Sequence, residues 1–196
     1  MRAVTPLRLL ALVLSGALLV GACSSSSDEE ADAGAATEDA GSGDEFPVTI
    51  THAFGETEIT EPPERVVTWG WGSADAAIAL GVVPVAIPFQ EYGGDEQGVL
   101  PWIREALEEQ GAELPEILPN SEEAPVEAIA AAEPDLVLAA YSGLTEEEYE
   151  LLSEVAPVVA YPEEAWSTPW RELVEIVGTA LGRSDEAAAL LDEIDA

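Results

Sequence analysis

The sequence has 196 residues, of which 40 are Asp or Glu and six are Arg, and its formal net charge is −34 at pH 7. This balance excludes nucleic-acid binding, which needs basic patches. It is compatible with steering of a cationic ligand or basic partner, or simply with a solvated acidic surface. The single Cys, Cys23, excludes an intramolecular disulfide, so the fold must depend on its hydrophobic core.

Residues 1–22 have the pattern of a secretory signal peptide: a basic start, an apolar run over residues 9–20 and small residues before Cys23. The run is too short for a spanning helix, which needs roughly 20 apolar residues. Residues 20–23 (Val-Gly-Ala-Cys) also resemble the bacterial lipobox. That resemblance implies cleavage before Cys23 and a lipid, diacylglycerol with palmitate-type chains, on its sulfur. The alternative is an ordinary signal peptide with an incidental Cys.

Residues 23–46 are expected to form a disordered tether. Their first twenty or so residues are Ser, Asp, Glu, Ala, Gly and Thr, without an aromatic or large aliphatic side chain. Such a segment cannot bury enough apolar surface to offset the entropy of ordering. We therefore expect it to hold a folded domain, residues 47–182, clear of the membrane.

The folded part begins with an alternating pattern at residues 47–59 that predicts a β-hairpin turning near Gly55. Helical signals follow, with Ser73 as an expected N-cap and Thr145 with Glu148 as an expected capping box. Buried strands are predicted at 65–69, 82–87, 135–139 and 158–161, and helices at 74–80, 100–110, 126–132, 145–155, 170–181 and 186–194. This alternation predicts an α/β fold, a Rossmann-like, mainly parallel sheet with helices on both faces.

Ligands of such sheets bind at the carboxyl ends of the strands. The predicted ends are 69–73, 88–92, 140–143 and 162–166, which hold three of the five Trp and two of the four Tyr. Trp71, Tyr92, Tyr141 and Trp166 are therefore candidate ligand contacts. Trp69 is expected in the core instead, and a role of Tyr141 in bracing its loop remains open.

Several segments in order resemble the iron-siderophore and cobalamin substrate-binding proteins of ABC importers, most of all the ferric-siderophore branch. They are residues 51–55, 63–67, 75–85, 126–129, 133–138, 142–145 and 156–157. The resemblance implies two α/β lobes joined by a long helix, with the ligand between them. Residues 47–182 then correspond to the N-terminal lobe, and 183–196 to the start of the joining helix. The C-terminal lobe is absent from this sequence, so we expect a truncated or split product, or an incomplete gene model.

The resemblance also implies roles for single residues. Trp71, with Gly72 and Ser73, lies in the first strand-to-helix turn and is expected to face the ligand, as are Tyr92, Tyr141, Ser142 and Trp166. Glu127 is expected to pair with Arg of an ABC permease. The remaining expected partners are a ferric siderophore and, through the lipid anchor, the membrane.

The iron would arrive already chelated, so neither a cofactor nor a protein metal site is expected. Few Arg are present, which favours neutral or cationic hydroxamate complexes over anionic catecholates. Haem and cobalamin remain open, as does a chain that binds nothing tightly.

An enzyme is not expected. His52 is the only His, and no Gly-rich phosphate loop or Gly-x-Ser-x-Gly turn occurs. The carboxylates are too numerous for one pair to be singled out as acid and base. His52 is expected to be a structural residue of the hairpin.

Overall fold

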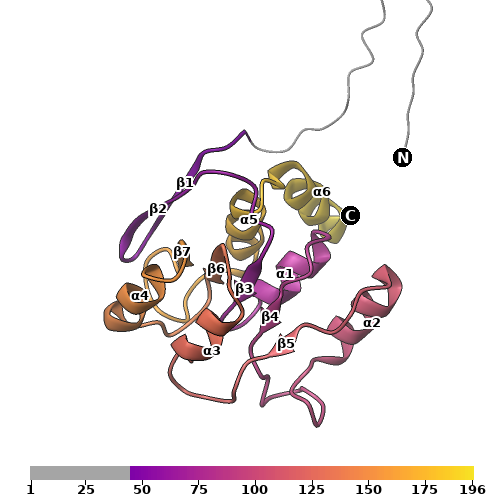
Figure 1. Ribbon diagram of the computed structural model, residues 1–196. Coiled ribbons are helices and arrows are strands. Elements are labelled where there is room, and N and C mark those ends of the chain that lie inside the picture. The colour runs from indigo at the N-terminus through magenta and orange to yellow at the C-terminus, as the bar shows by residue number, and fades with distance from the viewer. Residues whose placement is uncertain (1–44) are drawn as a thin grey trace, which may run out of the picture. The chain divides into compact units, whose positions relative to one another are not determined.

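In the computed structural model, which describes residues 45–196, five short strands form the central sheet (Figure 1). Their order is β5 (Glu116–Ile117), β4 (Ala86–Ile87), β3 (Val66–Thr68), β6 (Leu136–Ala139) and β7 (Val158–Ala160). Every pairing is parallel. The predictions for the signal peptide, for Cys23 and for all but the end of the tether lie outside the described residues.

Six helices of the described part cover the sheet on both faces. On one face lie α1 (Ser73–Ala79), α2 (Pro101–Gln110), α5 (Trp170–Ala180) and α6 (Ser184–Asp195), and on the other lie α3 (Val126–Ala131) and α4 (Glu146–Ser153). The strands alternate accordingly: Val66 packs in the core cluster of α1 and α5, whereas the next residue, Val67, packs in the cluster of α3 and α4. The predicted Rossmann-like α/β fold is confirmed.

The strand order reverses between β3 and β6. From β3 the chain runs outward through β4 and β5, and then returns to place β6 on the other side of β3. In open parallel sheets such a reversal leaves a crevice at the carboxyl ends of the two strands, because their following loops diverge to opposite faces. The fold therefore positions any ligand at the ends of β3 and β6.

A separate antiparallel hairpin, β1 (Val48–His52) with β2 (Gly55–Ile59), precedes the sheet, as predicted. Ile50 and Ile59 point into the core. The Thr57 hydroxyl donates to the Val158 carbonyl at 2.6 Å, and the Ala53 amide donates to the Tyr161 carbonyl at 2.9 Å. The hairpin is thus held against β7.

Local sequence signals correctly predicted where several helices begin or end. The Thr145–Glu148 capping box is present at the start of α4, and α2 ends at Gly111, which has a left-handed φ of 65°. Helix α6 begins two residues before its predicted start. It packs so closely on α5 that a Cβ added to Gly178 would lie 2.5 Å from the Cβ of Ala187.

Two predictions about elements were wrong, and one strand was missed. Ser73 does not cap α1: Gly72 is the N-cap, and the Ser73 hydroxyl is buried without a hydrogen-bond partner among the described residues. The strand expected at 82–87 contracts to Ala86–Ile87. Strand β5 was not predicted, because it has only two residues and lies between Pro115 and Pro119. Its pairing with β4, a tertiary contact, is what makes it a strand.

Candidate ligand-binding site

The ends of β3 and β6 approach each other closely at the strand-order reversal. The Trp71 amide donates to the Tyr141 carbonyl at 2.9 Å, which joins the two loops directly. Gly70 permits this contact: its φ is 85°, and a Cβ there would lie 2.3 Å from the Tyr141 oxygen. Only a residue without a side chain fits between these two backbones.

Four aromatic rings gather over this junction. Trp71 lies 6.2 Å from Trp166 and 6.4 Å from Tyr92, and Tyr141 lies 5.7 Å from Trp166, measured between ring centroids. The planes are tilted or edge-to-face, as aromatic pairs prefer. Trp71 and Trp166 are each about half exposed, at 50% and 49%, and Tyr92 is 74% exposed. Three loops that are distant in sequence therefore present one aromatic surface to solvent.

Trp166 is held in place by its backbone and by Gly143. It has a left-handed φ of 59°, and its amide donates to the Ser142 carbonyl at 3.1 Å. A Cβ on Gly143 would lie 2.5 Å from the Trp166 Nε1, so the indole rests directly on that glycine. A left-handed conformation costs a non-glycine residue about 1–3 kcal/mol and persists where surrounding contacts require it.

Trp71, Tyr92 and Trp166 border a pocket of about 310 Å³. Trp69, only 9% exposed, belongs to the hydrophobic core, as predicted, and also lines this pocket. Polar lining comes from residues that sequence reasoning did not single out: Gln90, Asn120, Ser121 and Glu122. Asn120 and its neighbours follow the unpredicted strand β5, so their place at this edge was not evident from the sequence.

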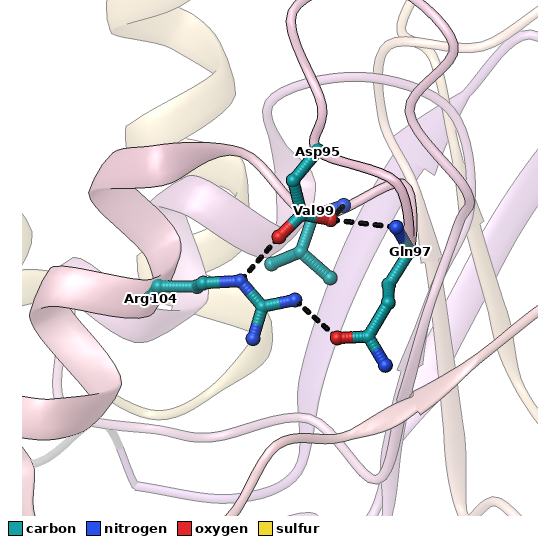
Figure 2. A network of polar contacts seen from close by, with 4 residues as sticks. All are labelled: Asp95, Gln97, Val99 and Arg104. Carbon is teal, nitrogen blue, oxygen red and sulfur yellow. Dashed lines mark hydrogen bonds and ion pairs between the residues drawn. The ribbon is translucent and has the colours of Figure 1, made fainter.

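A network of hydrogen bonds and an ion pair holds the loop that carries Tyr92 in place (Figure 2). The Arg104 side chain, from α2, donates to the Asp95 carboxylate and to the Gln97 amide oxygen. Asp95 also accepts the backbone amides of Gln97 and Val99. The hydrogen bond from Arg104, with help from the two amides, lowers the pKa of Asp95 to about 2, and the same contact raises the pKa of Arg104.

Acidic groups, and no Arg, line the pocket. Its carboxylates are Glu91, Glu122 and Glu148. Burial alone would raise the pKa of Glu148, but hydrogen bonds from the Thr145 hydroxyl, the Thr145 amide and the Ala124 amide lower it, so this residue is anionic. The pocket therefore disfavours an anionic ligand.

The four Arg of the described part are engaged elsewhere. Arg65 donates to the carbonyls of Ala132 and Glu133 at the end of α3, a role in supporting the fold that the sequence had suggested. The others, Arg104, Arg171 and Arg183, pair with Asp95, Asp195 and Glu186.

Four of the expected site residues do not line the pocket: Gly72, Ser73, Tyr141 and Ser142. Tyr141 instead lines a separate hollow of about 330 Å³, which also includes Trp71. The Ser142 hydroxyl is fully buried, donates to the Ala139 carbonyl at 2.8 Å and accepts from the Leu144 amide, so it shapes the turn. Ser73 is buried as well. Gly72 has a φ of 73°, and its missing Cβ leaves room for the Leu173 side chain. The buried hydroxyls of Ser73 and Ser142 are therefore not side-chain contacts for a ligand in this structure, and a contact through their backbones stays a prediction.

Glu127 does not line the aromatic pocket. It is exposed in the first turn of α3 and lines a groove of about 620 Å³ between α3 and α4, with an apolar part formed by Val126, Ala130 and Leu151. The prediction that it docks on a permease stays a prediction.

Another hollow lies elsewhere on the described part of the chain. A hollow of about 630 Å³ lies near residues 59–64 and 155–157, at the amino ends of strands, and no aromatic ring lines it. Within residues 45–196, no group of three His, Cys, Asp or Glu is placed to hold a metal ion, and no helix is long and apolar enough to cross a membrane. His52 is buried in the hairpin, as expected.

A parallel sheet with an aromatic pocket at its strand-order reversal defines a ligand-binding α/β lobe. The chain belongs to the periplasmic binding protein family, which matches residues 66–196. The family predicted from the sequence is thus confirmed.

Known proteins of this family are similar over about three quarters of the chain. An ABC transporter substrate-binding lipoprotein of Bacillus subtilis, YhfQ, is 28% identical over 76% of this chain and 40% of its own length. The Fe(3+) dicitrate-binding protein FecB of Escherichia coli is 28% identical over 76% of this chain and 47% of its own. PiaA of Streptococcus pneumoniae, solved with ferrichrome, is 40% identical over 74% of this chain and 48% of its own, with a TM-score of 0.70. The chain thus spans less than half the length of these relatives.

Proposed function

We propose that this chain is the ligand-binding lobe of an extracytoplasmic solute-binding protein that captures a ferric siderophore for an ABC importer. One observation carries the proposal: exposed Trp71, Trp166 and Tyr92 converge on a pocket at the one place where this fold binds ligands. The names of the related proteins support it, since PiaA was solved with ferrichrome and FecB binds ferric dicitrate.

The chemistry of the pocket favours a chelated, uncharged or cationic iron complex. Aromatic faces cover apolar parts of a ligand, and Gln90, Asn120 and Ser121 offer hydrogen bonds to its oxygens. With no Arg and three carboxylates in the lining, neutral or cationic ferric hydroxamates fit better than anionic catecholates. Iron arrives inside the chelate, so the protein supplies shape and contacts and carries out no reaction.

Isothermal titration of the purified chain with a panel of ferric siderophores tests the proposal. We expect saturable binding of a ferric hydroxamate, and Trp166→Ala to weaken it about tenfold, as loss of a central aromatic contact does. The control is Ile194→Ala, which removes an exposed apolar side chain from α6, away from the pocket. Absence of saturable heat with every complex would refute the proposal.

The proposed localisation at the membrane depends on residues 20–23, which precede the part that the structure describes. The lipobox-like residues 20–23 and the lipoprotein name of the Bacillus subtilis relative support a lipid on Cys23 and a place on the outer face of the membrane. Expression of Cys23→Ala in a bacterial host should move the protein from the membrane fraction to the soluble fraction and abolish labelling by radioactive palmitate. A membrane-bound variant would contradict the anchor.

A docking role for Glu127 completes the proposal. This role is supported by the exposure of Glu127 and by its position in the lining of the groove between α3 and α4, where a carboxylate can pair with Arg of a partner. We expect Glu127→Arg to reduce iron uptake in cells while the purified chain keeps its ligand affinity. Normal uptake would remove Glu127 from the docking surface.

A further inference from the structure

A second hollow adjoins the pocket on the other side of Trp71. It measures about 270 Å³, and seven residues line it, from the turn between β3 and α1, from α1, from the loop that follows β4 and from the start of α2. Three of them are aromatic: Trp71, Tyr92 and Trp102. Trp102 is an exposed ring on a helix whose core contacts are Ile103 and Leu107, so packing of the helix does not require a ring at this position.

The hollow contains one carboxylate, that of Asp75, in the first turn of α1. The Trp102 indole Nε1 donates to the Asp75 Oδ1 at 2.6 Å. This bond fixes the indole beside the carboxylate. The second carboxylate oxygen has no partner among the described residues, so Asp75 offers a free acceptor. The Gln90 amide nitrogen donates to the Gly70 carbonyl, and its oxygen is a further acceptor in this lining.

Aromatic walls around a single carboxylate are suited to an organic cation. Ring faces attract a positive charge through their quadrupole, and a carboxylate adds charge attraction and accepts hydrogen bonds from an ammonium group, which has three to donate. A metal cation would need more ligands than this hollow offers, since no cluster of three His, Cys, Asp or Glu occurs in residues 45–196. An anionic group would meet the Asp75 charge without any compensating Arg.

We propose that this hollow is a subsite for an alkylammonium group of the bound ligand, with Trp71, Tyr92 and Trp102 around the cation and Asp75 as its counter-ion. The inference rests on the proposed function in one respect: the ammonium belongs to an iron chelate whose body occupies the neighbouring pocket. Trp71 lines both hollows, so one ligand can extend from the first into the second.

A matched pair of ligands tests the subsite. One is a linear ferric trihydroxamate that ends in a primary amine, and the other is the same complex acetylated on that amine. We expect the purified chain to bind the amine form about tenfold more tightly in calorimetry, with a preference that shrinks as salt is added. Equal affinities would overturn the proposal.

Two variants sharpen the result. Asp75→Asn removes the charge but keeps an oxygen for the Trp102 indole, so the variant should remain folded and lose the preference for the amine. Glu105 is an exposed carboxylate on α2 outside the hollow, so Glu105→Gln should keep the preference for the amine. A preference that persists in Asp75→Asn would overturn the role of this residue as counter-ion.

A simple probe separates the subsite from the siderophore function. Millimolar n-butylammonium chloride should shift the indole N–H signals of Trp71 and Trp102 in ¹H–¹⁵N spectra, whereas n-butanol should not. If no ferric siderophore of the panel binds but butylammonium gives these shifts, the proposed function fails and the ammonium subsite stands. If butylammonium gives no shifts, the subsite is refuted whether or not the chelates bind.

Discussion

The close approach of β3 and β6 at Gly70 makes a quantitative prediction. In Gly70→Ala the new Cβ would lie 2.3 Å from the Tyr141 carbonyl oxygen and 2.8 Å from the Ser142 Cβ, so a backbone must move. The left-handed φ of 85° costs an alanine about 1 kcal/mol, and overpacking costs about 1–3 kcal/mol. Loss of the Trp71–Tyr141 hydrogen bond, if it breaks, costs about 1 kcal/mol more. We expect a total loss of about 3–5 kcal/mol.

Gly81 provides the matched control. Its φ of 80° is nearly the same, but no atom lies within 4 Å of a Cβ built there. Gly81→Ala should therefore lose only the conformational part, about 1 kcal/mol. The effect of an added methyl group on the unfolded chain is common to both variants and cancels in the comparison.

Urea unfolding, followed by circular dichroism, measures the two losses. With a slope of about 2 kcal/mol per molar urea, the midpoint should fall by about 2 M for Gly70→Ala and by about 0.5 M for Gly81→Ala. Equal losses would refute the reasoning, because they would mean that the contact between the two strand ends contributes nothing. The Gly70 variant should also lose ligand binding, since Trp71 and Tyr141 move apart.

Three further results are expected from the same structure. Thr57 donates to a carbonyl and so accepts a hydrogen bond from the Nε2–H of His52, and burial lowers the pKa of His52 below 6.5. The free energy of unfolding should therefore decrease as the pH falls from 7 through that lowered pKa. Urea midpoints measured at each pH should show a smaller decrease in His52→Gln. Thr145→Ala removes the capping box and should lose about 1 kcal/mol in the same assay. Asp95→Asn should make the Tyr92 loop more mobile at pH 7, which faster amide hydrogen exchange would show. In the unchanged chain the pKa of Asp95 is lowered to about 2, so its carboxylate should hold the loop in place down to about pH 3.

Part of the site was predictable because it depends on local chemistry. Apolar runs that alternate with helical segments require a parallel sheet, and the carboxyl ends of its strands are where Trp71, Tyr92, Tyr141 and Trp166 occur in the sequence. The burial of Trp69 next to an exposed Trp71 also agrees with the prediction. The burial of the Ser73 and Ser142 hydroxyls was not evident from the sequence, because the direction of a short polar side chain depends on the turn around it.

By itself, the sequence determined the order of the elements other than β5, the capping box at Thr145 and the acidic character of the surface, because these depend on residues that are adjacent or on composition. Only the tertiary structure decided which loops meet. Pairing of β3 with β6 brings Trp71 to Tyr141, and pairing of β5 with β4 brings Asn120 to the pocket. The contact of Trp102 with Asp75, 27 residues apart, depends likewise on how α2 packs on α1. No periodicity encodes such distances, because they follow from the packing of helices and strands against one another.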